Sequence, residues 1–338
     1  MAGTGSGGPG APQGPVFLGI DLGGTKVLAL AADAAGAVLG RAVASTPAED
    51  GPDAIADALA SAAAGALADG GVSDAPVRAF GIAAAGAIDI HSGTIVHSPH
   101  LPTASDMPVV AMLGERLGAP GVIGNDANLA ALAEHRYGAG QDTDDLLFIT
   151  VSTGIGGGII SRGKLLLGAD GYAGEIGHMT IDAGGPLAKS TTPGAWEALC
   201  SGTALARIAT ERINAGEPSS LAAALADTGT EALTARDVFA AYHEGDKLAQ
   251  SVIADGVRHM AVALTSLVNI LNPGKIIIGG GLSNQWDDYI APAVALMREQ
   301  SFAGIGVATP VVLPALGADA GAYGAIALAR EAVDEGTI

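Results

Sequence analysis

The stretch VFLGIDLGGTKVLALAAD, residues 16–33, decides how the rest of the chain is interpreted. One aliphatic run ends at Asp21, a Gly-Gly pair follows, and a second aliphatic run begins after Lys26. Such runs are typical of strands, and the glycines predict a tight turn between them. Backbone N–H groups in a turn of this kind can bind phosphate oxygens, while the carboxylate of Asp21 can hold Mg²⁺. For this stretch alone, an ordinary hairpin turn is an equally good interpretation.

Two further glycine runs follow apolar segments. Residues 144–166 contain two β-rich runs joined through TGIGGG at 153–158, and GGG at 279–281 ends the run KIIIG. Two glycine-turn hairpins, each opening an α/β half, predict a duplicated architecture that holds a ligand between its halves. The two turns suit a nucleoside triphosphate, and the third run suits adenosine lying against bare backbone. A plain glycine-rich turn is the alternative for TGIGGG taken alone, and GGG taken alone is weak evidence.

Helical patterns connect the predicted strands. The spacing of apolar residues and the positions of Pro and Gly predict helices over 52–69, 108–117, 246–271 and 319–333, and a strand over 77–86.

Asp126 lies at a predicted strand-to-helix junction, in the run Asn125-Asp126-Ala127-Asn128. Asn125 is the expected cap of the helix that begins there. A carboxylate held on a rigid element at a sheet end can accept the proton of an attacking hydroxyl. The alternative is that Asp126 only stabilises the helix N-terminus.

Glu175 and His178 are three residues apart in GEIGH, so on a helical turn they share a face. Together with Glu197 they supply groups that match sugar hydroxyls, which both donate and accept hydrogen bonds. A structural hydrogen bond between Glu175 and His178 is the alternative.

The composition is that of a compact acidic protein. Hydrophobic residues make up 49% of the 338 residues and charged residues 15%, with a net charge of −19. This length suffices for two domains of roughly 100 to 200 residues each. So acidic a chain is a poor partner for a nucleic-acid duplex, although backbone amides and a cation can still create a local nucleotide site.

The sequence gives no sign of export, membrane insertion or a disulfide. Residues 1–15 lack the basic and apolar regions of a signal peptide, and we expect a flexible tail there. Gly, Asp or Arg interrupts each apolar stretch before it could span a bilayer. The single cysteine, Cys200, excludes an intramolecular disulfide and a cysteine-built metal site. We therefore expect a cytoplasmic protein without a membrane partner.

Taken together, DLGGTK, NDAN, TGIGGG, GEIGH, EALCSG and GGGLS resemble, in this order and spacing, the ROK family of sugar kinases and related repressors. The resemblance covers nearly everything from residue 16 to the C-terminal helix. It implies an α/β protein with the actin-like ATPase (ribonuclease H-like) fold, whose two lobes close over a central cleft. The small N-terminal lobe would span 16–121 and be completed by a helix at about 322–338, while 122–321 would form the large lobe.

The resemblance also implies roles for individual residues. Asp126 matches the catalytic base of in-line phosphoryl transfer from ATP, and Asp21 would hold Mg²⁺ through water. The sugar-contacting positions of the family match Gly86, Asn125, Asp126, Glu175, His178 and Glu197. The phosphate-loop positions match Asp21, Gly23, Gly24, Thr25, Thr153 and Gly154, and we expect Lys26, Gly156, Gly280 and Gly281 to bind ATP as well. A homodimer or homotetramer is implied.

The chain departs from the family pattern in two places. Members commonly bind a structural zinc through the histidine of GEIGH and three cysteines, whose positions here are Ala188, Ser190 and Ala195. One histidine cannot hold Zn²⁺ in a closed tetrahedral site, so we predict no zinc. In addition, His100 stands where the family usually has Asn, and we expect it to lie near the substrate.

The leading interpretation is a glucokinase-like hexose kinase that acts on the 6-hydroxyl. A kinase for an N-acylhexosamine or for a cyclitol or other carbocyclic sugar analogue is the main alternative. A sugar-sensing regulator without catalysis would need a DNA-binding segment, and only a short Gly/Pro-rich tail precedes the first strand. A homologue that has lost its activity is the remaining alternative.

Overall fold

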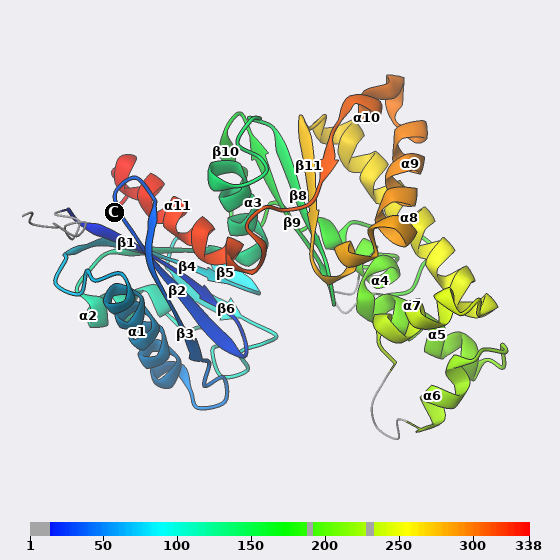
Figure 1. The fold of residues 1–338 in the computed structure, drawn as a ribbon, viewed down its shortest axis with the longest axis horizontal. Coiled ribbons are helices and arrows are strands. Elements are labelled where there is room, and N and C mark those ends of the chain that lie inside the picture. Colours follow the sequence, from blue (N-terminus) through cyan, green and yellow to red (C-terminus); the bar gives the residue numbers. More distant parts are fainter. Residues whose placement is uncertain (1–13, 188–191, 228–232) are drawn as a thin grey trace, which may run out of the picture. The chain divides into compact units, whose positions relative to one another are not determined.

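The computed structural model describes residues 14–187, 192–227 and 233–338. The chain divides into two compact units, each built around a five-stranded sheet (Figure 1). The first unit contains the described residues up to Gln141 together with 167–173 and 316–338, and the second contains 142–166 and 174–315.

The sheet of the first unit has the order β3-β2-β1-β4-β7. β1 pairs antiparallel with β2, and β2 pairs antiparallel with β3, whereas β1, β4 and β7 are parallel. Its strands are β1 (Val16–Leu22), β2 (Lys26–Ala32), β3 (Val38–Ser45), β4 (Val77–Ala84) and β7 (Gly121–Asn125). A small separate hairpin is formed by β5 (Ala87–Asp89) and β6 (Thr94–His97). Since parallel strands end at one edge, Asp21 of β1 and the residue after β7, Asp126, lie at the same edge.

Helices cover both faces of this sheet (Figure 1). α1 (Pro52–Asp69) and α2 (Val109–Leu117) pack over one hydrophobic core, in which Ile55, Leu59 and Phe80 are fully buried. On the other face, α11 (Ala320–Asp334) contacts β1 and β4 and packs beside α3 (Asp126–Tyr137). The C-terminal helix is therefore part of the unit that the first strand begins.

Glycines in the two central strands allow α11 to lie against the sheet. A Cβ at Gly19 would lie 2.1 Å from the carbonyl oxygen of Ala322, and a Cβ at Gly81 would lie 2.0 Å from that of Ala325. No real Cβ tolerates such a distance, so glycine at these strand positions sets how closely the helix approaches.

β7 and α3 belong to the first unit, whereas the sequence placed the start of the large lobe at residue 122. The reason is sheet pairing, because β7 forms a parallel ladder with β4, and α3 packs against α11. Hydrophobic pattern alone does not reveal which sheet a strand joins.

The sheet of the second unit repeats this plan, with the order β10-β9-β8-β11-β12. β8 pairs antiparallel with β9 and parallel with β11, as β1 does with β2 and β4. Its strands are β8 (Leu146–Val151), β9 (Ile155–Ser161), β10 (Lys164–Leu165), β11 (Lys275–Gly279) and β12 (Val311–Val312). The duplicated architecture that the two glycine-turn hairpins predict is thus present in the topology.

The helices of the second unit surround a core that includes the fully buried Trp196 and Tyr289. They are α4 (Trp196–Cys200), α5 (Gly202–Asn214), α6 (Leu221–Asp227), α7 (Ala235–His243), α8 (Lys247–Leu271), α9 (Ala291–Gln300) and α10 (Ile305–Ala308). Short helical turns are η1 (Ile176–His178), η2 (Gly281–Gln285), η3 (Trp286–Ile290) and η4 (Phe302–Gly304), while η5 (Gly317–Asp319) belongs to the first unit.

α8 is the one helix in the described residues that is long and apolar enough to cross a membrane. Half of its most apolar window is buried inside the protein, and it contacts α4, α5, α7 and α9. These contacts are those of a core helix.

Several helices begin and end where the sequence predicts. α1 spans the residues that the sequence predicts, and Asn125 caps α3, with its side-chain oxygen accepting from the N–H groups of Ala127 (3.0 Å) and Asn128 (3.3 Å). α8 is capped by Asp246 and ends at Asn272, whose φ of 43° lies in the left-handed region. The predicted strand over 77–86 ends two residues earlier, at Ala84, because Gly86 turns the chain into β5.

Candidate active site

The first group of candidate residues lies at the carboxyl edge of the first sheet. Asp21 is in β1, just before the turn that contains Gly23, Gly24 and Thr25. This turn is closed by a hydrogen bond from the N–H of Gly23 to the carbonyl of Lys26 (3.0 Å), and Thr46 donates its hydroxyl to the carbonyl of Gly23 (2.7 Å). One hydrogen bond within the turn and one from Thr46 therefore fix its conformation.

The carboxylate of Asp21 lies over the start of α11. A Cβ at Gly321 would lie 2.8 to 3.1 Å from its carboxylate atoms, so a larger residue there would displace the carboxylate. Within the described part of the chain, no group donates a hydrogen bond to this carboxylate. A largely buried carboxylate without a hydrogen-bond donor suits a hard cation, which prefers oxygen ligands.

Asp126 stands at the same edge as Asp21. In the ladder, Asp21 is opposite Ala83 of β4, and Ala83 is opposite Gly124 of β7. Two strand spacings separate the backbones of Asp21 and Gly124 by about 10 Å. Asp126 follows Asn125 as the first residue of α3, and its side chain accepts from the N–H of Ala127 (2.9 Å).

The two carboxylates have raised pKa values. Burial, followed by the charge of Asp126, raises the pKa of Asp21 to about 6, while the charge of Lys26 acts in the opposite direction. Asp126 remains accessible to solvent, yet the surrounding protein removes enough of its hydration to raise its pKa. Backbone hydrogen bonds and the charge of His100 oppose this rise. A carboxylate with a raised pKa is a stronger base than an ordinary aspartate.

His100 and Gly86 lie near these groups, although the sequence separates them from both loops. A Cβ at Gly24 would lie 2.8 Å from the Cβ of His100, so the histidine packs against the first glycine turn. Gly86 has a φ of 116°, and a Cβ there would lie 2.2 Å from the carbonyl oxygen of His97. The segment from His97 to His100 therefore passes close to both Gly86 and the turn.

In the second unit, the turn between β8 and β9 is bonded to Glu197. The N–H of Ile155 donates to Oε2 of Glu197 (2.9 Å), and a Cβ at Gly154 would lie 2.5 Å from that oxygen. The N-terminus of α5 also contacts this turn, because the N–H of Gly202 donates to the carbonyl of Ser152 (2.7 Å). Gly156 lies within β9, opposite Thr150. Glu197 thus contacts the predicted phosphate loop directly, which the sequence alone did not indicate.

Glu175 and His178 flank the short turn η1 and share a face, as their spacing predicts. Nε2 of His178 lies 3.7 Å from Oε2 of Glu175, and both side chains are about half exposed. η1 packs on β9, where a Cβ at Gly177 would lie 2.1 Å from the carbonyl oxygen of Ile155. The turn is also joined to α4, since the N–H of Trp196 donates to the carbonyl of Met179 (2.9 Å).

The residues around His178 do not fit a structural zinc. Two of the three family cysteine positions, Ala188 and Ser190, lie outside the described residues, and the third, Ala195, is a buried alanine. The only cysteine of the chain, Cys200, is buried in the core, where its Sγ contacts the carbonyl oxygen of Gly256 and burial raises the pKa of the thiol. Among the described residues, no group of three or more His, Cys, Asp or Glu could hold a metal ion.

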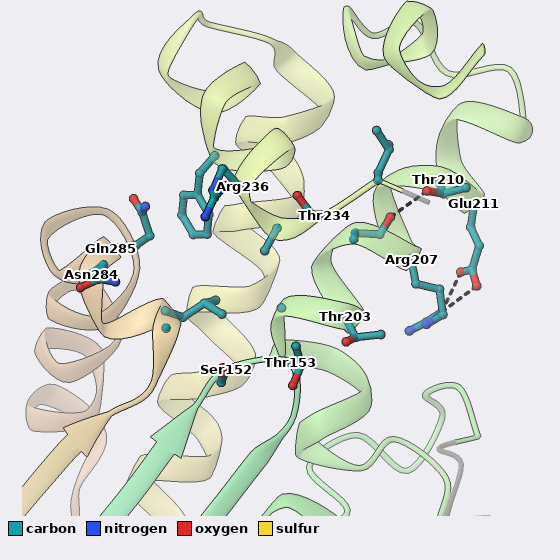
Figure 2. Close-up of a pocket in the computed structure, with 17 residues that line it drawn as sticks. Ser152, Thr153, Thr203, Arg207, Thr210, Glu211, Thr234, Arg236, Asn284 and Gln285 are labelled. Atoms are coloured by element: carbon teal, nitrogen blue, oxygen red, sulfur yellow. Dashed lines mark hydrogen bonds and ion pairs between the residues drawn. The ribbon is translucent and has the colours of Figure 1, made fainter. Parts of the chain in front are cut away.

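The second unit also contains a pocket of about 790 Å³ (Figure 2). Ser152 and Thr153 line it from the end of β8, and Gly281 and Leu282 line it from η2. Gly280 has a φ of 87° and a Cβ there would lie 2.4 Å from the carbonyl oxygen of Val151, so the glycine run crosses the end of β8 closely. This volume is in the range of small-molecule and cofactor sites.

Much of the pocket comes from residues that the sequence analysis did not select. They lie on α5, on α7 and at the end of η2, and include Thr203, Arg207, Arg236, Phe239 and Asn284. No motif marks them, because helices far apart in the sequence supply the walls. The same holds for Gly321 in the first unit, which only the packing of α11 brings to Asp21.

The ROK family model matches residues 17–332. The chain belongs to the ROK family. A glucokinase from Halalkalibacterium halodurans is 36% identical over 315 residues, covering 91% of this chain and 93% of that protein. An N-acetylmannosamine kinase from Escherichia coli is 33% identical over 267 residues, covering 78% of this chain and 82% of that protein. This ROK chain is a sugar kinase, a phosphotransferase that acts on an alcohol group.

Solved structures of the family have the same fold. The ROK hexokinase from Thermus thermophilus matches with a TM-score of 0.81 and 34% identity, over 95% of this chain and 99% of that one. A ROK glucokinase from Streptomyces griseus, solved with glucose and AMPPNP, matches with a TM-score of 0.71 and 33% identity, over 94% and 99%. A ROK transcriptional regulator, a homologue of the E. coli MLC protein, matches with a TM-score of 0.79 and 27% identity, over 96% and 80%. The chain thus has the actin-like ATPase fold of ROK kinases.

Proposed function

We propose that this ROK protein transfers the γ-phosphoryl group of ATP to a hydroxyl of a hexose, most simply O6, in the manner of a glucokinase. The observation that carries the proposal is the pair of carboxylates at one sheet edge, where Asp126 has a raised pKa and Asp21 accepts no hydrogen bond from any described residue. The similarity to a glucokinase at 36% identity supports the hexose, and the Streptomyces griseus structure with AMPPNP supports a nucleoside triphosphate as donor.

In this mechanism the oxygen of the attacking sugar hydroxyl bonds to the γ-phosphorus while Asp126 accepts the hydroxyl proton. The bond between the γ-phosphorus and the bridging oxygen breaks, and that oxygen leaves with ADP. General-base action of this kind contributes about 10²- to 10⁴-fold. Asp21 would hold Mg²⁺ through water, and this cation would stabilise charge on the phosphates. Backbone N–H groups of the turns at Gly23–Gly24 and at Thr153–Gly154 would bind phosphate oxygens, assisted by Thr25, Lys26 and the neighbouring glycines.

For the acceptor, we propose two groups of contacts. Asn125, Gly86 and His100 would position the sugar near Asp126. Glu175, His178 and Glu197 would bind sugar hydroxyls. We further place the reaction in the cytoplasm and expect a homodimer or homotetramer.

A kinase for an N-acylhexosamine is the second candidate. His100 favours it, because an imidazole packed against Gly24 differs in size and hydrogen bonding from the asparagine usual in the family. The similarity to an N-acetylmannosamine kinase at 33% identity also supports it.

The test is ADP release on a panel of hexoses, N-acylhexosamines and cyclitols, with wild-type protein and the variant Asp126→Asn. We expect the wild type to phosphorylate at least one hexose and Asp126→Asn to lose at least about 100-fold in kcat. Full activity in Asp126→Asn would exclude Asp126 as the base. A wild type that binds sugar but releases no ADP with any acceptor would be a sensor. Product analysis by NMR identifies the hydroxyl.

A further inference from the structure

Arg236 occupies an unfavourable place for a cation. It is the second residue of α7, whose N-terminus is capped by Thr234. The positive end of a helix dipole destabilises a cation in the first turn and stabilises an anion there. Asp237, the next residue, supplies the anion in this first turn. Its carboxylate accepts hydrogen bonds from the backbone N–H (2.8 Å) and the hydroxyl (2.7 Å) of Thr234. Arg236 supports this cap only through its charge, a minor cause of the lowered pKa of Asp237, which comes mainly from the hydrogen bonds of Thr234.

The two arginines that line the pocket differ in their hydrogen bonds. Arg207, which lines the same pocket, donates to both carboxylate oxygens of Glu211 (2.7 and 2.8 Å) and to the carbonyl of Ala198 (2.8 Å). The side chain of Arg236 is exposed, and in the described ranges it forms neither a hydrogen bond nor an ion pair. Arginine and lysine together number only 16, against 35 acidic residues, so positively charged side chains are scarce in this chain.

The position of Arg236 in the pocket separates it from the phosphate loop. Figure 2 shows Ser152 and Thr153 where β8 ends, with Arg236 well apart from them on α7 and Gln285 to one side. Around α7 the wall is apolar, with Phe239 and Leu233 almost fully buried. If the triphosphate binds at Thr153, the part of the nucleotide that reaches α7 is the base.

We propose that Arg236 binds the nucleobase of the phosphoryl donor, with its planar guanidinium lying over the face of the ring. This inference rests on the proposed function, because the pocket must be the donor site. An arginine over an aromatic face contributes about 0.5 to 2 kcal/mol, which corresponds to a 2- to 30-fold change in affinity. The contact does not depend on the phosphates, and stacking of this kind requires the planar group rather than charge alone.

The test compares ligands that carry only one part of the donor. Calorimetric titrations measure the affinity of wild type, Arg236→Ala and Arg236→Lys for two ligands. Adenosine lacks phosphates, and tripolyphosphate lacks a base. We expect Arg236→Ala to weaken the binding of adenosine by about 10-fold and to raise the KM for ATP by a similar factor. The affinity for tripolyphosphate and kcat should not change. Arg236→Lys should restore little of the adenosine affinity.

The matched control is Arg258→Ala, which removes an exposed arginine on α8 that is paired with Asp255 and lies outside the pocket. It should change no affinity. Because Arg236 opposes the dipole of α7, Arg236→Ala should unfold at the same temperature as wild type or slightly higher, so misfolding would not explain its loss of affinity.

Any of three results would overturn the inference. They are an unchanged adenosine affinity in Arg236→Ala, an equal loss of tripolyphosphate affinity in that variant, and a full return of adenosine affinity in Arg236→Lys. Failure of the proposed function looks different. A wild type that turns over no acceptor but binds adenosine in an Arg236-dependent way would refute the kinase proposal and support the base contact.

Discussion

At the scale of single residues, Asp126 shows how the fold changes the chemistry of a side chain. As the first residue of α3 it has the favourable place of any acidic residue at a helix N-terminus. Loss of hydration nevertheless raises the pKa of Asp126, and burial raises the pKa of the nearby Asp21 to about 6. Neither shift can be deduced from the run NDAN, since both depend on strands that are separated in sequence.

The raised pKa of Asp126 predicts the acid limb of the pH profile. The carboxylate must be ionised to accept a proton, so kcat/KM should fall as pH decreases through the folded-state pKa, at a pH clearly above the ordinary value of 3.8. Because the charge of His100 lowers the pKa of Asp126, His100→Asn should move this limb to higher pH. Steady-state profiles on a good acceptor provide the measurement, with the exposed His91→Asn as control. An acid limb near 3.8 in wild type would contradict the prediction.

Glu197 is a second residue whose surroundings only the structure shows. The sequence selected it as a sugar contact, yet its Oε2 accepts from the N–H of Ile155 beside the second glycine turn. Losing a hydrogen bond to a charged group costs about 1.5 to 3 kcal/mol. We therefore expect Glu197→Ala to lower kcat/KM for ATP by at least about 10-fold in addition to raising the sugar KM. Glu299→Ala, on the exposed side of α9, is the control, and an effect confined to the sugar KM would argue against the loop contact.

At the scale of elements, the packing of α11 on the first sheet depends on the absence of side chains in β1 and β4. The carbonyls of Ala322 and Ala325 occupy the places that Cβ atoms of Gly19 and Gly81 would take. α11 in turn brings Gly321 beneath Asp21, so the position of the candidate metal ligand and the packing of the last helix are linked.

Gly81→Ala should therefore destabilise the protein strongly. The added Cβ would lie 2.0 Å from the backbone oxygen of Ala325, which cannot move without shifting α11. Overpacking of this kind costs about 1 to 3 kcal/mol or more, measured as the free energy of unfolding in urea. Gly184→Ala, where the nearest atom lies 3.6 Å from the Cβ, should change stability little. Equal stability of the two variants would show that α11 adjusts at no cost.

At the scale of the whole molecule, two sheets with the same strand order each carry one glycine turn between their antiparallel strands. Each sheet has its own hydrophobic core. The chain keeps the histidine of GEIGH while the cysteines that accompany it in the family are replaced.

We accordingly expect the purified protein to contain no stoichiometric zinc. Elemental analysis measures the content, and thermal unfolding with and without EDTA measures the consequence. A ligand that binds only the folded state stabilises that state, so removal of a structural zinc lowers the melting temperature of a protein. The melting temperature of this protein should not change in EDTA. Zinc at one equivalent, or a clear loss of stability in EDTA, would refute this prediction.

The sequence by itself determined most of the local structure and the family. Glycine turns after aliphatic runs, the Asn125 and Asp246 caps and the stop at Asn272 depend on neighbours within a few residues, and the ordered motifs identified the ROK family. Only the tertiary structure decided that β7 joins the first sheet and α3 the first unit, that Gly321 lies beneath Asp21, and that Arg236 lines a pocket with Thr153. The physical reason is distance along the chain: strand pairing, helix packing and pKa shifts arise between residues that no local pattern connects.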